Sequence, residues 1–98
     1  MKLTKEYLNQ LRYFHAIAKG RETGIFDNWE TVKKLTNGFS DALQERFGKP
    51  WEAVEYLIRH LTLRGKTEKL NLDELETLDS CRKLVDDRWR QEEKESLI

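Results

Sequence analysis

The sequence predicts an α+β fold, because short strand-like runs lie near its N-terminus and helical periodicity fills most of the remainder. Residues 13–18 form an aromatic and apolar run that ends at residues 19–21, and residues 24–26 form a second short run. Two such runs around a glycine-containing turn are typical of an antiparallel hairpin, here with a five-residue loop. Apolar residues spaced three and four apart then indicate helices near residues 29–36, 51–61 and 71–95.

Length and composition bound the class of protein. The 98 residues allow one domain with one core, so we expect residues 1–98 to form a single unit. A charged fraction of 37% with 10% aromatic residues suits a folded, soluble chain. The lone cysteine, Cys81, excludes an internal disulfide and favours a reducing, cytoplasmic location. We find no apolar run long enough to span a membrane and expect no membrane partner.

Charge is balanced overall but unevenly distributed along the chain. Residues 1–50 hold nine Lys and Arg against six Asp and Glu, whereas residues 51–98 hold nine against twelve. Because phosphate contacts supply much of the affinity of nucleic-acid binders, any such surface must lie in the first half. The modest excess of positive charge there predicts modest affinity.

Helix signals appear on both sides of the hairpin. Residues 4–11 predict a short helix capped by Thr4, and residues 1–12 are an N-terminal helical extension. Asn28 is placed to cap the helix at 29–36, and Asn37-Gly38 end it. Pro50 at a first helical position begins the next helix, whose apolar face would be formed by Trp51, Val54, Leu57, Ile58 and Leu61.

A long C-terminal helix is predicted over residues 70–96. Residues 64–66 would be the connection before it, and Asn71 with Glu74 resembles a capping box at its start. Its apolar stripe either closes the domain's own core or pairs with a second copy or a partner's helix. Arg82 interrupts the stripe, so a regular coiled coil is not expected. The stripe consists of Leu75, Leu78, Cys81, Val85 and Trp89.

Residues 41–47 allow two interpretations. Their Ala, Leu, Gln, Glu and Arg residues favour a helix by intrinsic propensity. Pairing with the hairpin would instead make them a strand, and tertiary pairing often overrides propensity over so few residues.

Residues 13–57 resemble the hybrid-binding domain at the N-terminus of type-1 ribonucleases H, which also occurs in caulimovirus viroplasmin proteins. The resemblance rests on residues 13–30, on Asn37-Gly38-Phe39, on Arg46-Phe47 and on residues 52–57. It implies a strand at 41–47 and thus a three-stranded antiparallel sheet with two helices. The short N-terminal helix and the long C-terminal helix flank this core.

The resemblance also implies a set of nucleic-acid-binding residues. Trp29 would lie against the sugar–phosphate backbone of a DNA strand. Lys19 and Arg21, in the hairpin loop, and Arg46, on the third strand, would contact phosphates or 2′-hydroxyls. His15 stands where the family has a nucleic-acid-contacting tyrosine.

Two departures from the family pattern weaken this expectation. Gln44 and Glu45 replace a phenylalanine and a lysine of the family's basic strand. We expect Glu45 to face phosphate with the wrong sign and Gln44 to offer no apolar surface to a sugar.

Catalysis is not expected. The resemblance implies that nuclease activity belongs to a separate, larger domain, and no cofactor or metal is predicted. His15 and His60 have no Cys or carboxylate at ligand spacing, and Cys81 has no evident base nearby.

Two functional hypotheses therefore remain open. The first is non-catalytic binding of RNA/DNA hybrid or double-stranded RNA, recognised by backbone and shape without sequence preference. It predicts a steep salt dependence with few phosphate contacts, on the order of three or four. The second is a protein–protein interaction module that kept the fold and lost nucleic-acid binding, for example an accessory protein of a phage or mobile element.

Overall fold

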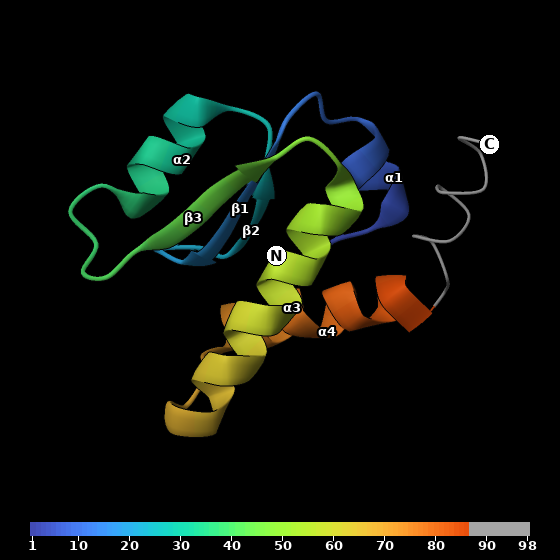
Figure 1. The fold of residues 1–98 in the computed structure, drawn as a ribbon. Coiled ribbons are helices and arrows are strands. Elements are labelled where there is room, and N and C mark those ends of the chain that lie inside the picture. Colours follow the sequence, from blue (N-terminus) through green and yellow to red (C-terminus); the bar gives the residue numbers. More distant parts are fainter. Residues whose placement is uncertain (87–98) are drawn as a thin grey trace.

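A computed structural model describes residues 1–86 and confirms the predicted α+β fold (Figure 1). A three-stranded sheet lies between α2 on one face and α3 on the other, and α4 packs on α3. The elements are α1 (Lys5–Asn9), β1 (Phe14–Lys19), β2 (Gly24–Phe26), α2 (Trp29–Thr36), β3 (Leu43–Phe47), α3 (Pro50–Thr67) and α4 (Leu72–Asp86).

The sheet is antiparallel throughout, with strand order β2-β1-β3. The segment with two interpretations is therefore a strand, because residues 43–47 pair with β1 along its free edge. Main-chain pairing here overrides the helical propensity of the side chains. A register shift between Ile17 and Lys19 leaves Ala18 outside the regular pairing, and its carbonyl accepts a hydrogen bond from Arg64 Nη1 at 2.6 Å.

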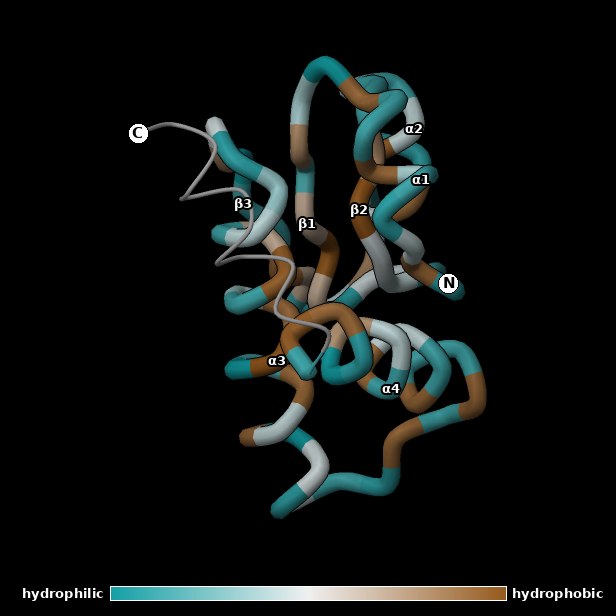
Figure 2. The backbone as a smooth tube through the Cα atoms, turned by 90° about the vertical axis from the view of Figure 1, so that its right-hand side faces the viewer, coloured by the Kyte–Doolittle hydropathy of each residue, from teal (hydrophilic) through white to brown (hydrophobic). Residues whose placement is uncertain are grey.

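Alternation along β1 divides the core between the two faces of the sheet. Phe14 and Ala16 point toward α3, where they join Val54 and Leu57 in the main cluster. Ile17 points the other way and packs with Phe26 and Val32 beneath α2. Figure 2 shows hydrophobic stretches in β1, in β2 and along α3 where it lies beside α4.

The predicted helix starts are confirmed by their capping hydrogen bonds. Thr4 accepts the amide of Tyr7 at 3.1 Å, and Asn28 accepts the amide of Glu30 at 2.7 Å. Asn71 and Glu74 form the predicted reciprocal capping box, with distances of 3.0 and 2.8 Å.

The hairpin loop is shorter than predicted, because Lys19 belongs to β1 and pairs with Leu43. Four residues, 20–23, then connect β1 to β2. Gly20 lies so close to the end of α2 that a Cβ there would be 2.8 Å from the Leu35 carbonyl oxygen. Glycine is therefore required by a close approach of two backbones.

The predicted connection at residues 64–66 is wrong, because α3 continues through Gly65 to Thr67. Arg64 stabilises this last part of the helix: its guanidinium bonds the Ala18 carbonyl and forms an ion pair with Glu74 of α4. Gly65 packs beside Leu70, and a Cβ at this position would be in ordinary van der Waals contact with Leu70 Cδ1 at 3.5 Å. Tertiary contacts thus extend a helix that sequence signals would end.

The predicted apolar stripe of α4 is also partly wrong. Leu78 and Cys81 are buried, but Leu75 and Val85 are exposed, and Trp89 lies outside the described residues. Leu84 is buried instead, and the remaining buried positions of this face are polar: Glu74, Thr77 and Ser80. Because this face packs into the domain's own core, core closure accounts for the buried part of the stripe.

Polar contacts explain why polar residues of α4 face inward. The ammonium group of Met1 bonds Asp73 Oδ1 at 2.9 Å and Thr77 Oγ1 at 2.8 Å. Asp73 Oδ2 accepts the amide and hydroxyl of Thr23 at 2.8 and 2.9 Å. Ser80 Oγ accepts the amide of Leu3 at 3.0 Å. Through these bonds, α4 holds both the N-terminal segment and the hairpin loop.

Across residues 1–86, no helix combines the length and the apolar character that a membrane span requires.

Candidate nucleic-acid interface

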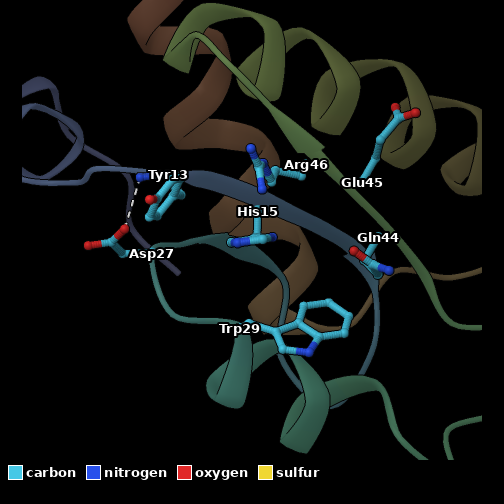
Figure 3. A pocket seen from close by; sticks show the side chains of 7 residues that line it. All are labelled: Tyr13, His15, Asp27, Trp29, Gln44, Glu45 and Arg46. Carbon is cyan, nitrogen blue, oxygen red and sulfur yellow. Dashed lines mark hydrogen bonds between the residues drawn. The ribbon is translucent and has the colours of Figure 1, made fainter.

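An open groove of about 610 Å³ lies on the α2 side of the sheet (Figure 3). It is bounded by the start of β1, the first residue of α2 and the exposed strand β3. Its lining residues are Tyr13, His15, Asp27, Trp29, Gln44, Glu45 and Arg46. Three of the five predicted contact residues, His15, Trp29 and Arg46, therefore meet in one place.

Three aromatic side chains form a row across this groove. The ring of His15 lies between the other two, with centroids 5.9 Å from Trp29 and 6.5 Å from Tyr13. His15 is only 7% exposed, whereas Trp29 is 50% exposed and Tyr13 is 48% exposed. The two outer rings are thus available to a ligand, while the central one supports them.

Sheet geometry explains why these residues come together. Tyr13 and His15 are two residues apart, so the pleat places them on one face. His15 pairs directly with Arg46 on β3, which brings the guanidinium onto the same face. The Arg46 guanidinium carbon lies 5.3 Å from the centroid of the Tyr13 ring, in a cation–π contact.

His15 is held in its neutral form. Burial lowers the pKa of His15 below its ordinary value of 6.5, Arg46 lowers it further, and Asp27 opposes the shift. Its Nδ1 is buried and has no hydrogen-bond partner within the described residues. At neutral pH, the positive charge of the groove therefore resides on Arg46.

Asp27 is the acidic member of the groove, but its carboxylate serves the backbone. Oδ1 accepts the amides of Arg12 at 3.2 Å and Tyr13 at 2.9 Å (Figure 3). These bonds fix the residues that lead into β1 and so fix the position of the Tyr13 ring.

Glu45 lines the groove, but its carboxylate is directed away from the other lining side chains. Glu45 pairs with Ala16, which points toward α3, so its side chain lies on the opposite face of β3 from Arg46. Its charge raises the pKa of Tyr56 on α3, after the larger effect of burial. Figure 3 shows Glu45 pointing away from the other labelled side chains. Gln44 does lie on the groove side, beside Trp29.

Lys19 and Arg21 do not line this groove. Arg21 Nη1 donates to the carbonyls of Lys34 at 3.0 Å and Asn37 at 2.7 Å, and the Arg21 amide donates to Leu35 at 2.8 Å. Arg21 thus satisfies the otherwise unpaired carbonyls at the end of α2. This turn therefore closes the end of α2, and the phosphate contacts predicted for Lys19 and Arg21 stay predictions.

A second hollow of about 470 Å³ lies on the other side of Trp29 and Gln44. It runs along α2 to the loop before β3, and Lys33 is its charged lining residue. The ammonium of Lys33 is 3.9 Å from Glu30, both side chains being well exposed. A ligand that crosses Trp29 would therefore meet a cation on either side, Arg46 or Lys33.

Tyr13 lines the groove, but the sequence analysis did not include it among the residues expected to contact nucleic acid. Its exposure and its contact with Arg46 follow from the strand pairing, which was uncertain in the sequence. The available signal was its spacing of two from His15 in a predicted strand.

Metal-ligating residues do not gather in this part of the protein. Among residues 1–86, no group of three or more His, Cys, Asp or Glu side chains is placed to hold a metal ion.

Comparison with known proteins finds a family match for the segment that forms the groove. Residues 13–57 match the family described as the ribonuclease H1 N-terminal domain. The predicted resemblance is confirmed. The segment related to the ribonuclease H1 N-terminal domain runs from β1 into α3 and contains all three strands and α2. Helices α1 and α4 lie outside it.

One curated relative matches a stretch of similar length. Ribonuclease H of Saccharomyces cerevisiae is 36% identical over 44 residues, which cover 45% of this chain and 13% of that protein. The similarity thus concerns a small part of that relative. No solved structure shows significant similarity to this chain.

Proposed function

We propose that this protein is a non-catalytic module that binds RNA-containing duplexes, RNA/DNA hybrid or double-stranded RNA, through the groove between α2 and β3. The observation that carries the proposal is the half-exposed Trp29, supported by His15 and flanked by Arg46, within the segment that matches the ribonuclease H1 N-terminal domain.

The chemistry of the groove suits a sugar–phosphate backbone. An exposed indole offers a flat apolar surface to a sugar, and the guanidinium of Arg46 can form charge-assisted hydrogen bonds with phosphate. Glu45 belongs to the lining, but its carboxylate is directed to the opposite face of β3 from Arg46. Such contacts read backbone and shape rather than base edges, which predicts little sequence preference.

The number of cations near Trp29 predicts the response to salt. Arg46 lies on one side and Lys33 on the other, while Arg21 is engaged at the end of α2. We therefore expect about two or three phosphate contacts and a correspondingly shallow dependence of log affinity on log salt.

Fluorescence anisotropy with matched RNA/DNA hybrid, RNA duplex and DNA duplex tests the proposal. The wild type is compared with Trp29→Ala, Trp29→Phe and the control Leu72→Ala, which removes an exposed apolar side chain from α4, outside the groove. Circular dichroism checks that each variant remains folded. We expect salt-sensitive binding that favours the RNA-containing duplexes.

Trp29→Ala should weaken this binding by roughly tenfold, within the range for loss of an aromatic contact to nucleic acid. Trp29→Phe should retain part of it, and Leu72→Ala should leave it unchanged. Absence of binding to all three duplexes at low salt would overturn the proposal.

A further inference from the structure

We propose that Tyr13, with Arg46 resting on its ring, is a second nucleic-acid contact of the groove, placed to receive a further part of the strand held by Trp29. This inference rests on the proposed function and adds a contact residue that the sequence pattern did not indicate.

Exposure is the first observation. Tyr13 and Trp29 are the two large hydrophobic side chains of the groove that remain about half exposed, and they lie at opposite ends of the aromatic row. Aromatic side chains can bury much apolar area in a complex at a small cost in conformational entropy, because they have few rotatable bonds. Tyr13 therefore offers a ligand the same kind of surface as Trp29.

Preorganisation is the second observation. The backbone amide of Tyr13 donates to Asp27 at 2.9 Å, and its ring lies tilted against that of His15 at a centroid distance of 6.5 Å. Neither interaction needs the exposed face of the ring. The side chain is thus positioned before a ligand arrives, which lowers the entropic cost of binding.

The contact with Arg46 is the third observation. A free arginine side chain loses much rotamer entropy when it binds phosphate, but the Tyr13 ring already holds this guanidinium 5.3 Å from its centroid. Ring and cation together present an apolar face beside a positive charge, the combination that a sugar and its phosphate require.

The neighbouring position on β3 explains why this contact matters in this chain. Gln44 lies beside Trp29 and has no apolar ring to offer a sugar. The apolar surface of the groove is therefore concentrated at its two ends. A strand laid across Trp29 reaches Tyr13 by following the row over the buried His15.

Anisotropy titrations of a fluorescent RNA/DNA hybrid test the inference. The proteins are the wild type, Tyr13→Ala, Tyr13→Phe, Arg46→Ala, the double variant Tyr13→Ala/Arg46→Ala, and Leu72→Ala as the surface control. Trp29→Ala is included so that loss of the proposed function can be told apart from loss of this contact. The side chain of Tyr13 is half exposed and its hydrogen bond to Asp27 uses only the backbone, so all Tyr13 variants should fold.

We expect Tyr13→Ala to weaken binding by roughly five- to tenfold, at the lower end of the range for an aromatic contact. Tyr13→Phe should stay within about twofold of wild type, because the ring and its cation–π contact remain. The double variant should lose less than the product of the two single losses, because the two residues act together. The slope of log affinity against log salt should be shallower for Tyr13→Ala than for wild type, and should approach the slope for Arg46→Ala.

Two results would overturn the inference while leaving the proposed function intact. One is binding by Tyr13→Ala within twofold of wild type when Trp29→Ala has lost it. The other is an equal loss in Tyr13→Phe and Tyr13→Ala, which would assign the effect to the hydroxyl. If the wild type binds no duplex, the proposed function fails and this inference fails with it.

Discussion

Arg21 illustrates how the role of one residue depends on the element beside it. Its guanidinium and its amide satisfy three carbonyls at the end of α2, and Gly20 permits the loop to approach that closely. Exposed polar groups at a helix end can be satisfied by water, so the contribution to stability is moderate. The residue nevertheless fixes where α2, and with it Trp29, lies on the sheet.

We predict that Arg21→Ala lowers the free energy of unfolding by about 0.5–1.5 kcal/mol, the usual net worth of such hydrogen bonds. Urea denaturation measures this change. Lys34→Ala is the matched control, because it removes an equal charge from the last turn of α2 and leaves the backbone carbonyls bonded. Unchanged stability in Arg21→Ala, together with weaker duplex binding, would show that Arg21 contacts the ligand instead.

At the scale of elements, α4 holds the hairpin loop in place through hydrogen bonds. Asp73 bonds the Met1 ammonium on one side and the amide and hydroxyl of Thr23 on the other. Thr77 joins the same cluster, since its hydroxyl lies 2.7 Å from that of Thr23. A helix outside the segment that matches the ribonuclease H1 N-terminal domain thus holds a loop inside it.

The pKa of Asp73 reflects these hydrogen bonds. Burial alone would raise the pKa, but hydrogen bonds from Met1 and Thr23 and the charge of the ammonium lower it below 3.8. A carboxyl group with a lowered folded-state pKa stabilises the protein fully above its unfolded pKa. This stabilisation is lost as the pH falls through the folded value.

We therefore expect Asp73→Asn to lower the free energy of unfolding by about 1–2 kcal/mol at pH 7, in the range for hydrogen bonds to a charged group. The difference from wild type should shrink below about pH 4, as the wild-type carboxylate becomes protonated. Denaturant melts at several pH values measure this. Asp79→Asn, on the same helix but exposed, should change stability by no more than about 0.5 kcal/mol. A difference for Asp73→Asn that is independent of pH would contradict the assignment.

At the scale of the whole molecule, the main core joins the sheet to α1, α3 and α4. Cys81, on the inward face of α4, is fully buried in this core, and burial raises the pKa of its thiol to about 12 despite the nearby Met1 ammonium. A thiol in this state is a poor nucleophile, because the thiolate is the reactive form.

We predict that Cys81 resists alkylation in the native protein at pH 8 and reacts fully in denaturant. The rate of labelling should rise with denaturant in step with unfolding, because exposure of Cys81 requires α4 to leave the core. Mass spectrometry of samples quenched over time measures the rate. Rapid native labelling that does not depend on denaturant would show that α4 opens independently of the remainder.

Local signals in the sequence determined the hairpin and where the helices begin. Hairpin residues, Thr4, Asn28, Pro50 and the Asn71–Glu74 capping box act over a few residues, so they were predictable without the fold. The family resemblance supplied the third strand and brought His15, Trp29 and Arg46 to one site.

Contacts between distant residues decided the remainder. Arg64 contacts Ala18 and Glu74, so α3 continues beyond its predicted end. The polar contacts around Asp73 orient α4 so that its predicted apolar stripe is only partly buried. The pairing of β1 with β3 sends Glu45 to one face and Arg46 with Tyr13 to the other. These outcomes depend on register and on partners up to 79 positions away, and no local pattern encodes them.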